Sequence, residues 1–318
     1  MIAFVFPGQG SQHVGMGKSL SDRFDICRET LEHADEAVGV SLSTLCFQGP
    51  DDALMLTENT QPAVLAVSIA VYRLLASRGI TPDIVAGHSL GEYSAHVAAG
   101  TISFADALRT VRRRGQYMQE AVPVGTGAMA AILGLDAQTV EQACQESAGA
   151  DIVSPANLNA PGQVVIAGHR SAVERASARA KELGARRAMP LPVSAPFHCA
   201  LMKPAEQRLE PELRSLIVSD PSMPVVANVD AEPKRDATAA IDALVRQVSA
   251  PVKWEAVVGR LVAEGVRTFV EVGPGKVLSG LIRKIDRQAQ TVNVEDLDGL
   301  ARLEQLLAGP AETSQVGG

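Results

Sequence analysis

The sequence predicts an α/β protein: a parallel sheet covered by helices on both faces, with a smaller α/β unit inserted into it. Short apolar runs alternate with helical patterns over residues 1–125 and again over 193–309. Aromatic residues make up only 3% of the 318 residues, so aliphatic side chains must fill the core, as they do between helices and a sheet. The last residues, 310–318, have the composition of a disordered tail.

The composition narrows the class of function. The net charge is −7, which argues against nucleic acid as a partner because no basic excess is present to replace phosphate counterions. The chain starts in a strand, without a basic leader or an apolar segment long enough for a membrane, and its four cysteines lack metal-ligand spacing. We therefore expect a cytoplasmic monomer with free thiols, no metal or other cofactor, and no membrane attachment.

The first predicted strand, Ile2–Phe6, ends in a glycine-rich loop, Pro7–Gln12. The loop has neither the G-x-G-x-x-G pattern nor the lysine of a phosphate-binding loop, which disfavours nucleotide binding. Two interpretations remain. Its main-chain N–H groups supply part of an oxyanion hole, or the loop is only a tight turn.

Two helical stretches, Arg28–Ala37 and Leu42–Phe47, precede a clear helix start. Thr60 is a suitable N-cap and Pro62 fits a first turn, so a helix is expected over Ala63–Ser77. This segment is apolar on almost every side, which predicts a buried helix.

An apolar run, Ile84–Ala86, breaks at a G-x-S-x-G pattern, Gly87–Gly91, and continues as a helical segment, Glu92–Ala99. A strand that turns abruptly into a helix forces its apical serine into a strained conformation, and the flanking glycines let neighbouring chains approach. The pattern predicts that Ser89 is a nucleophile held above the positive end of a helix. The alternative is a tight structural turn.

Ser103 begins the next predicted helix, which runs to about Ala121 and carries three consecutive arginines. On a helical wheel Arg113 points away from the apolar stripe, whereas Arg112 and Arg114 flank it on opposite sides. One of these two can reach a cleft at the helix edge, although a basic triplet is more often a solvated face.

Residues 126–192 follow the order β-α-β-β-α-β, which is typical of a ferredoxin-like unit. Its expected strands are Ala128–Leu133, Ile152–Ser154, Val164–Ala167 and Arg186–Leu191, and its expected helices are Ala137–Ser147 and Ala172–Leu183. The main unit then resumes with helices Pro204–Leu216, Ala237–Val248 and Ala256–Glu264, strands Val225–Val229 and Thr268–Val272, and a helix after Gly275.

A serine nucleophile needs a base, and the chain has six histidines. Four are placed poorly relative to Ser89, which leaves His13 and His198. His198 is preferred because it lies where the chain returns from the inserted unit, and clefts form at such junctions. No acid is well placed in the sequence to orient this histidine, so a main-chain carbonyl or an amide must do so.

Five motifs occur together and in order: Phe6–Gln12, Gly87–Glu92, Arg114-Gly115, Ala195–His198 and Val270–Gly275. With them the sequence, over about residues 1–300, resembles the malonyl-CoA:acyl carrier protein transacylases and the related acyltransferase domains of fatty acid and polyketide synthases. The resemblance implies an α/β-hydrolase-like core, residues 1–125 and 193–309, that carries a ferredoxin-like insert, residues 126–192.

The resemblance also implies catalytic roles. Ser89 is the nucleophile and His198 is its base. Arg114 binds the malonyl carboxylate, which selects one of the two arginines that the helical wheel left open. Gln247 matches a glutamine beside the histidine, and neutral groups in that region orient the imidazole.

Four further residues are implied to bind the substrate. The main-chain N–H groups of Gln9 and Leu90 form the oxyanion hole. Asn159 matches an asparagine that lines the active site. Phe197 and Leu90 resemble residues of the malonyl-selective members and exclude an α-methyl branch.

The implied activity is transfer of a malonyl group from malonyl-CoA to the phosphopantetheine thiol of acyl carrier protein through a malonyl-serine ester, foremost in fatty acid biosynthesis. The alternatives are a serine thioesterase or hydrolase on the same core, a non-catalytic binding module, and malonyl transfer in polyketide synthesis or malonate decarboxylation. Malonyl-CoA and the carrier protein are the expected partners. Five basic residues are docking candidates or simply solvated charges: Arg186, Arg187, Arg283, Lys284 and Arg287.

Overall fold

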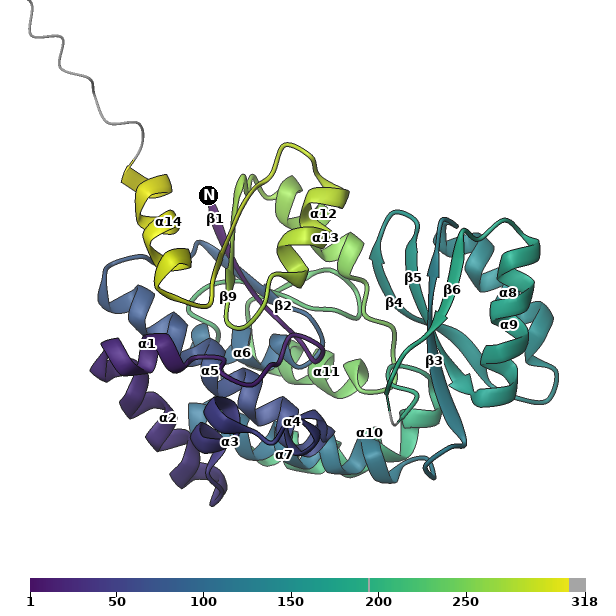
Figure 1. Ribbon diagram of the computed structural model, residues 1–318, viewed down its shortest axis with the longest axis horizontal. Helices are drawn as coiled ribbons and strands as arrows, with labels where there is room; N and C mark the ends of the chain where they lie inside the picture. Colours follow the sequence, from purple (N-terminus) through teal and green to yellow (C-terminus); the bar gives the residue numbers. More distant parts are fainter. Residues whose placement is uncertain (194, 309–318) are drawn as a thin grey trace, which may run out of the picture.

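The computed structural model describes residues 1–193 and 195–308, and the predicted tail lies outside the described residues (Figure 1). Its larger part is built on a six-stranded sheet with the order β10-β9-β1-β2-β7-β8. Neighbouring strands are parallel except for β8, which pairs antiparallel with β7 at one edge. The strands are β1 (Ile2–Phe6), β2 (Ile84–Gly87), β7 (Val225–Val226), β8 (Pro233–Lys234), β9 (Thr268–Val272) and β10 (Gln290–Val294). The predicted fold class is confirmed.

Successive side chains of a strand point to opposite faces of the sheet. Both faces are buried here because helices cover each of them. Phe4 and Phe6 of β1 pack into one apolar cluster, whereas Ala3 and Val5 pack into another. The first cluster includes side chains from α2 (Asp25–Val38), α5 (Thr57–Ser77), α6 (Gly91–Ala98), α7 (Phe104–Glu120), α10 (Lys203–Ser215) and α11 (Ala237–Gln247). The second includes side chains from α12 (Trp254–Ala263) and α13 (Val277–Ile285).

Helix α5 begins at Thr57, earlier than predicted. The short helix α4 (Asp51–Met55) ends just before it, and only Leu56 between them has an extended backbone. Thr60 therefore lies inside the helix, where its hydroxyl donates to the main-chain carbonyl of Leu54 at 2.6 Å instead of capping. By length and composition α5 could cross a membrane, but 78% of the relevant window is buried inside the protein, where it packs into the core.

The second sheet has four antiparallel strands in the order β4-β5-β3-β6, and helices α8 and α9 cover it on one side (Figure 1). The elements are β3 (Gly127–Leu133), α8 (Ala137–Ala148), β4 (Val153–Ala160), β5 (Gln163–His169), α9 (Arg170–Glu182) and β6 (Arg187–Pro190). This is the predicted β-α-β-β-α-β order. Strand β4 extends through residues expected in a turn, and it joins the main part because Leu158 N–H donates to the Val252 carbonyl at 2.9 Å.

Several elements were not expected from the sequence. Strand β10 lies at the edge of the main sheet and is only partly buried, so it lacks the apolar run that marks a central strand. Helix α14 follows it and covers that edge with Leu300 and Leu303. The remaining helices are α1 (Lys18–Arg23), α3 (Leu42–Gln48), η1 (Ala200–Met202) and α14 (Leu297–Ala308).

Candidate active site

Ser89 lies at the turn from β2 into α6, as the elbow pattern predicts. Its φ is +53°, in the left-handed region that residues with a side chain rarely adopt. A Cβ on Gly87 would lie 2.0 Å from the main chain of Gly91, and a Cβ on Gly91 would lie 2.1 Å from the Phe6 carbonyl oxygen. Only glycine fits these two positions, and the loop after β1 therefore packs directly against the elbow.

The strained turn is held by a side chain just beyond the end of β7, the next strand of the sheet. The N–H of Ser89 donates to Oδ1 of Asn228 at 2.7 Å, and Nδ2 of Asn228 donates to the Gly87 carbonyl at 2.7 Å. Both ends of one buried amide thus fix the main chain on either side of His88. The serine hydroxyl is left in one defined position at the end of the sheet.

His198 is the partner of the serine. Oγ of Ser89 and Nε2 of His198 are 2.7 Å apart, and Nδ1 lies 3.0 Å from the main-chain carbonyl of Gln247. A carbonyl only accepts, so Nδ1 carries the proton and Nε2 is free to take the proton of the serine. The predicted neutral group that orients this histidine is therefore a main-chain carbonyl.

Burial controls the basicity of His198. The side chain is 3% exposed. Burial, followed by the positive charge of Arg114, lowers the pKa of His198 to about 3. The imidazole is therefore neutral at physiological pH and ready to act as a base.

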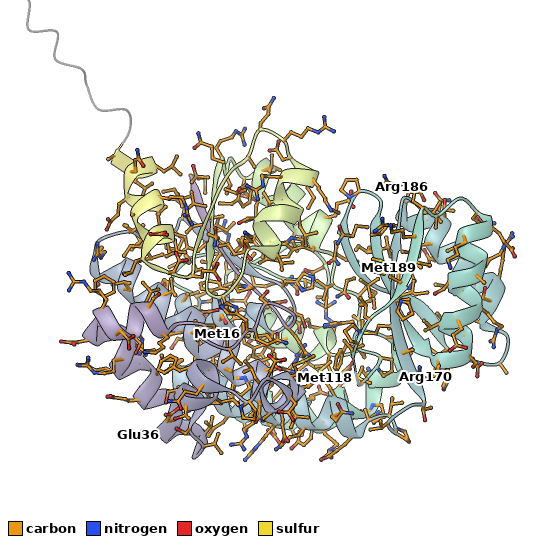
Figure 2. All side chains as sticks on the ribbon, in the orientation of Figure 1. Met16, Glu36, Met118, Arg170, Arg186 and Met189 are labelled. Atoms are coloured by element: carbon orange, nitrogen blue, oxygen red, sulfur yellow. The ribbon has the colours of Figure 1, made fainter. Side chains whose placement is uncertain are left out.

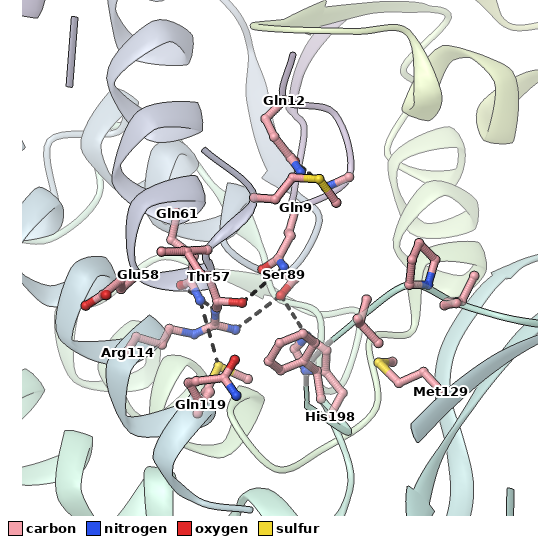
Figure 3. A pocket seen from close by; sticks show the side chains of 18 of the residues that line it. Gln9, Gln12, Thr57, Glu58, Gln61, Ser89, Arg114, Gln119, Met129 and His198 are labelled. Carbon is pink, nitrogen blue, oxygen red and sulfur yellow. Dashed lines mark hydrogen bonds between the residues drawn. The ribbon is translucent and has the colours of Figure 1, made fainter. Parts of the chain in front are cut away.

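Arg114 is the arginine of the triplet that enters the site, and it is 2% exposed (Figure 3). Its Nη1 donates to Oε1 of Gln61 at 2.7 Å, and its Nη2 donates to Oε1 of Gln247 at 2.9 Å and to Oγ of Ser89 at 3.1 Å. Burial lowers the pKa of this guanidinium. The other two arginines bind elsewhere: Arg112 donates to the Val38 carbonyl and Arg113 pairs with Glu212.

The charge of Arg114 is held by neutral oxygens. Over the described ranges, no carboxylate oxygen lies within 4.0 Å of this guanidinium. Elsewhere in those ranges, 18 pairs of a basic and an acidic side chain come within that distance. A buried cation without an anionic partner is costly unless a bound anion compensates it. The site is therefore built to receive a negatively charged group next to the serine hydroxyl.

A cavity of about 920 Å³ surrounds these three side chains. It lies between the main part and the second sheet, since its lining includes Gln9 and Phe197 on one side and Met129 and Asn157 on the other (Figure 3). Gly8 packs closely enough that a Cβ there would lie 2.4 Å from the His88 carbonyl, so the Gln9 loop lies directly beside the elbow. This is the position from which a second oxyanion donor is needed.

Two sequence-based expectations, on Asn159 and on the side chain of Leu90, need correction. Asn159 does not line the cavity: its Oδ1 lies 2.9 Å from Nε2 of His88, and Asn157 faces the cavity instead. Asn159 is assigned to the site only by the family resemblance, and the register of strand β4 shifts between Pro155 and Asn157 and again between Leu158 and Ala160. The side chain of Leu90 is 1% exposed in the core and is not part of the cavity lining, so only its N–H can serve there. His13, the other candidate base, lies exposed in a loop.

Sequence reasoning missed three residues that build the site. Gln61 lies between Thr60 and Pro62, the two residues that predict a helix start, and nothing in the local sequence indicates that it meets Arg114. Glu92 was treated as an ordinary helical residue. The sequence predicts a strand over Val225–Val229 that includes Asn228, but the strand ends at Val226. Asn228 therefore lies just beyond the carboxyl end of a parallel strand, where binding sites commonly form, and this position could have indicated its role.

The part of the chain that the structure describes contains no group of three or more His, Cys, Asp or Glu side chains placed to hold a metal ion. The four cysteines are buried and unpaired.

Fold and site together define a serine acyltransferase whose acyl group is anionic. The acyl transferase domain family matches residues 3–310. A malonyl CoA-acyl carrier protein transacylase from Salmonella typhimurium is 55% identical over 284 residues, which cover 89% of this chain and 92% of the relative. The counterpart from Bacillus subtilis is 50% identical over 296 residues, which cover 93% of each chain.

A solved structure agrees. The crystal structure of an acyl carrier protein S-malonyltransferase from Vibrio cholerae superposes with a TM-score of 0.93 at 48% identity, covering 95% of this chain and 99% of that one. The chain belongs to the family of malonyl CoA-acyl carrier protein transacylases.

Proposed function

We propose that this chain transfers a malonyl group from malonyl-CoA to the phosphopantetheine thiol of acyl carrier protein through a malonyl ester on Ser89. The observation that carries this proposal is the buried Arg114 guanidinium, held by neutral oxygens and 3.1 Å from the nucleophile. A malonyl group supplies the missing carboxylate, and its thioester carbonyl then lies beside the serine hydroxyl. Fatty acid biosynthesis is the proposed pathway; polyketide synthesis and malonate decarboxylation are the alternatives.

In the first half-reaction Ser89 Oγ attacks the thioester carbonyl of malonyl-CoA while His198 Nε2 takes the hydroxyl proton. The C–S bond then breaks, and the leaving CoA sulfur receives that proton from His198. The product is a malonyl ester on Ser89, with the imidazole neutral again.

In the second half-reaction the carrier thiol gives its proton to His198 and its sulfur attacks the ester. The C–O bond to Ser89 breaks, and the serine oxygen recovers the proton. Each proton and electron pair is accounted for by the serine, the histidine and the two thiols, so no cofactor enters these steps.

The N–H groups of Gln9 and Leu90 are the proposed oxyanion donors. The first lies in the loop packed on the elbow, and the second immediately follows the nucleophile at the start of α6. Loss of one such donor typically lowers the rate by about 10²–10³. Phe197 lies beside His198 on the cavity wall, where we propose that it limits branching at the α-carbon of the acyl group.

We place the carrier protein on the basic residues around the junction of the second sheet with α13, because carrier proteins of this kind are acidic. Lys284 Nζ donates to Oε1 of Gln163 at 2.8 Å, which joins α13 to β5. Arg186 lies just before β6 of the second sheet (Figure 2). Among the described residues, Arg187, Arg283 and Arg287 form no ion pair with a carboxylate. The ion pairs of arginine are formed by others, such as Arg179, Arg214 and Arg260. In support, the solved complex of a malonyl-transacylase with its type II PKS acyl-carrier protein has a TM-score of 0.93 at 48% identity, covering 94% of this chain and 97% of that one.

We propose that the protein acts as a monomer in the cytoplasm. The buried, unpaired thiols fit a reducing compartment.

The test is covalent labelling. After exposure to malonyl-CoA, intact-protein mass spectrometry is expected to show one added malonyl group on the wild-type protein and none on Ser89→Ala. Addition of carrier protein should then move the group to the carrier. A labelled Ser89→Ala protein contradicts the nucleophile assignment, and loss of the label to water at the same rate with and without carrier identifies a hydrolase.

A further inference from the structure

Glu92 is a fully buried carboxyl group directly behind the nucleophile, and the reaction described above does not use it. It lies in the first turn of α6. Its Oε2 accepts from Nε2 of Gln247 at 2.7 Å and from the main-chain N–H of Asn228 at 3.0 Å. Its Oε1 is buried and has no hydrogen-bond partner among the described residues.

The contact with Gln247 has a consequence for Arg114. An amide has a donor end and an acceptor end. Nε2 of Gln247 donates to Glu92 and also to the Ser89 carbonyl at 2.9 Å, so its Oε1 faces Nη2 of Arg114 at 2.9 Å. A flipped amide would set two donors against each other at Arg114 and two acceptor oxygens against each other at Glu92. The carboxyl oxygen and the Ser89 carbonyl together therefore fix which end of Gln247 meets the arginine.

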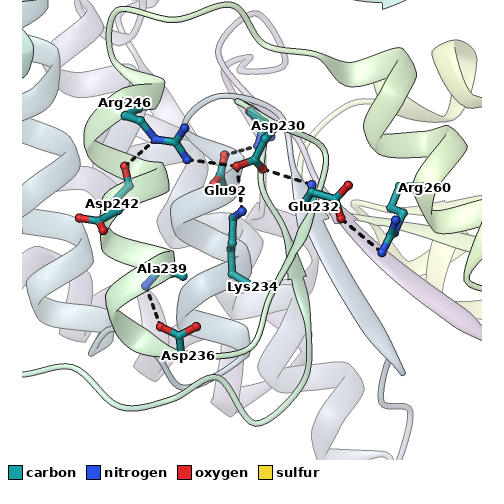
Figure 4. Close-up of polar contacts among 10 residues, drawn as sticks. Glu92, Asp230, Glu232, Lys234, Asp236, Ala239, Asp242, Arg246 and Arg260 are labelled. Atoms are coloured by element: carbon teal, nitrogen blue, oxygen red, sulfur yellow. Dashed lines mark hydrogen bonds and ion pairs between the residues drawn. The ribbon is translucent and has the colours of Figure 1, made fainter.

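Among the described residues Glu92 forms no ion pair with Arg114, although the two charges interact through space. The nearby Asp230 takes up two cations, Lys234 at 2.8 Å and Arg246 at 3.1 Å (Figure 4). Glu92 itself meets only neutral donors. Burial raises the pKa of Glu92 to about 7, while the hydrogen bonds from Gln247 and Asn228 and the charge of Arg114 oppose that shift.

One amide thus separates the carboxyl group from the guanidinium. A carboxylate in direct contact with Arg114 would neutralise it and compete with an anionic acyl group. An amide oxygen holds the same guanidinium without cancelling its charge. Oε2 of Glu92 can accept from the amide whether or not the carboxyl group is protonated, because the free Oε1 can carry the proton.

We propose that Glu92 is a positioning residue for acyl-group selectivity: by fixing the Gln247 amide, it holds Arg114 in the orientation that receives a carboxylate. This inference rests on the proposed function. Without the oxygen of Glu92, the Gln247 amide keeps only the Ser89 carbonyl as acceptor, so its orientation is less restricted and the acceptor that it presents to Arg114 is less well fixed. Transfer of malonyl is expected to fall, whereas transfer of acetyl, which has no carboxylate to align, changes little.

The experiment compares kcat/KM for malonyl-CoA and acetyl-CoA, with carrier protein as acceptor, in three single variants. Glu92→Asp withdraws the carboxyl group by one methylene and is expected to lower the malonyl-to-acetyl ratio roughly 10- to 100-fold, the effect of a lost hydrogen bond to a charged group. Glu92→Gln keeps an acceptor oxygen and is expected to retain the ratio within about threefold. The matched control, Glu271→Asp, shortens another buried carboxyl group, one that accepts from the N–H groups of Leu278 and Ser279 and does not touch Gln247.

A double-mutant cycle tests whether the effect passes through Gln247. In a Gln247→Leu background, Glu92→Asp is expected to cause no further loss of the ratio. Additive losses, or an equal loss in Glu271→Asp, would overturn the proposal, as would a full ratio in Glu92→Asp. If the wild-type protein itself shows no preference for malonyl, the proposed function fails and the role of Glu92 in selectivity fails with it, whereas a wild-type preference that Glu92→Asp retains overturns the role of Glu92 alone.

Discussion

Replacement of Arg114 by alanine separates the proposed role of this side chain from a structural one. The guanidinium is buried, reaches Ser89 Oγ at 3.1 Å and is bound by two amide oxygens. In Arg114→Ala the malonyl carboxylate would enter the cavity without a cationic partner. Acetyl-CoA carries no such group, so its transfer loses only whatever support Arg114 gives to the serine.

The magnitude follows from the burial of the pair. Truncation of one partner of a buried, hydrogen-bonded charge pair costs about 2–5 kcal/mol. Since about 1.4 kcal/mol corresponds to a factor of ten, kcat/KM for malonyl-CoA should fall roughly 30- to 4,000-fold relative to acetyl-CoA. The large end applies if the cavity excludes water around the carboxylate.

The assay measures carrier acylation from each thioester over a range of concentrations, with Arg113→Ala as the matched control. Arg113 is the next residue on the same helix but pairs with Glu212 at 3.0 Å on the outside. The control should keep the wild-type ratio. Equal losses of malonyl and acetyl transfer in Arg114→Ala would refute the reasoning, because they would show that Arg114 only supports the fold of the site.

Two further predictions concern buried histidines. Burial and the charge of Arg114 lower the pKa of His198 to about 3. In a pH series, kcat/KM should therefore fall on the acid side only as the pH approaches 3. A fall in kcat/KM centred at pH 6.5 would contradict this prediction. Burial also lowers the pKa of His96 to about 3 from 6.5, so its stabilising contribution is present above pH 6.5 and is lost as the pH falls toward 3. In His96→Phe the free energy of unfolding, measured with denaturant, should therefore depend less steeply on pH between pH 3 and 6.5 than in the wild-type protein. The two slopes should differ by at most about 1.4 kcal/mol per pH unit. An unchanged slope would refute the prediction.

The elbow could be predicted from the sequence because its causes are local. Gly87 and Gly91 lie two residues on either side of Ser89, and the close approaches of the chain explain why only glycine is tolerated there. The apolar strand before it and the helix after it are equally visible in the sequence. The helical wheel narrowed the arginine to two positions, and the family resemblance then selected Arg114.

The partners of Arg114 could not be predicted in the same way, because they come from elements far apart in the sequence. Gln61 lies 53 residues from Arg114 and Gln247 lies 133 residues away. Polar residues inside helices carry no sign of which distant side chain they will meet. Asn157 and Asn159 show a second limit, since the irregular register of β4 decides which of them faces the cavity.

Among the residues that the structure describes, the partner of His198 Nδ1 is a main-chain carbonyl and not an acid, and this follows from the kind of acyl group that the site must hold. A carboxylate in hydrogen-bond reach of Nδ1 would lie in the neighbourhood of Arg114, because the main-chain carbonyl of Gln247 lies 3.0 Å from Nδ1 and the side-chain oxygen of the same residue accepts from Arg114 at 2.9 Å. Such a carboxylate would pair with the guanidinium and repel a malonyl group. A main-chain carbonyl fixes the tautomer of the histidine without adding charge, so the arginine stays available to the substrate. The neutral partner of the histidine and the carboxylate-free arginine are therefore two consequences of one requirement.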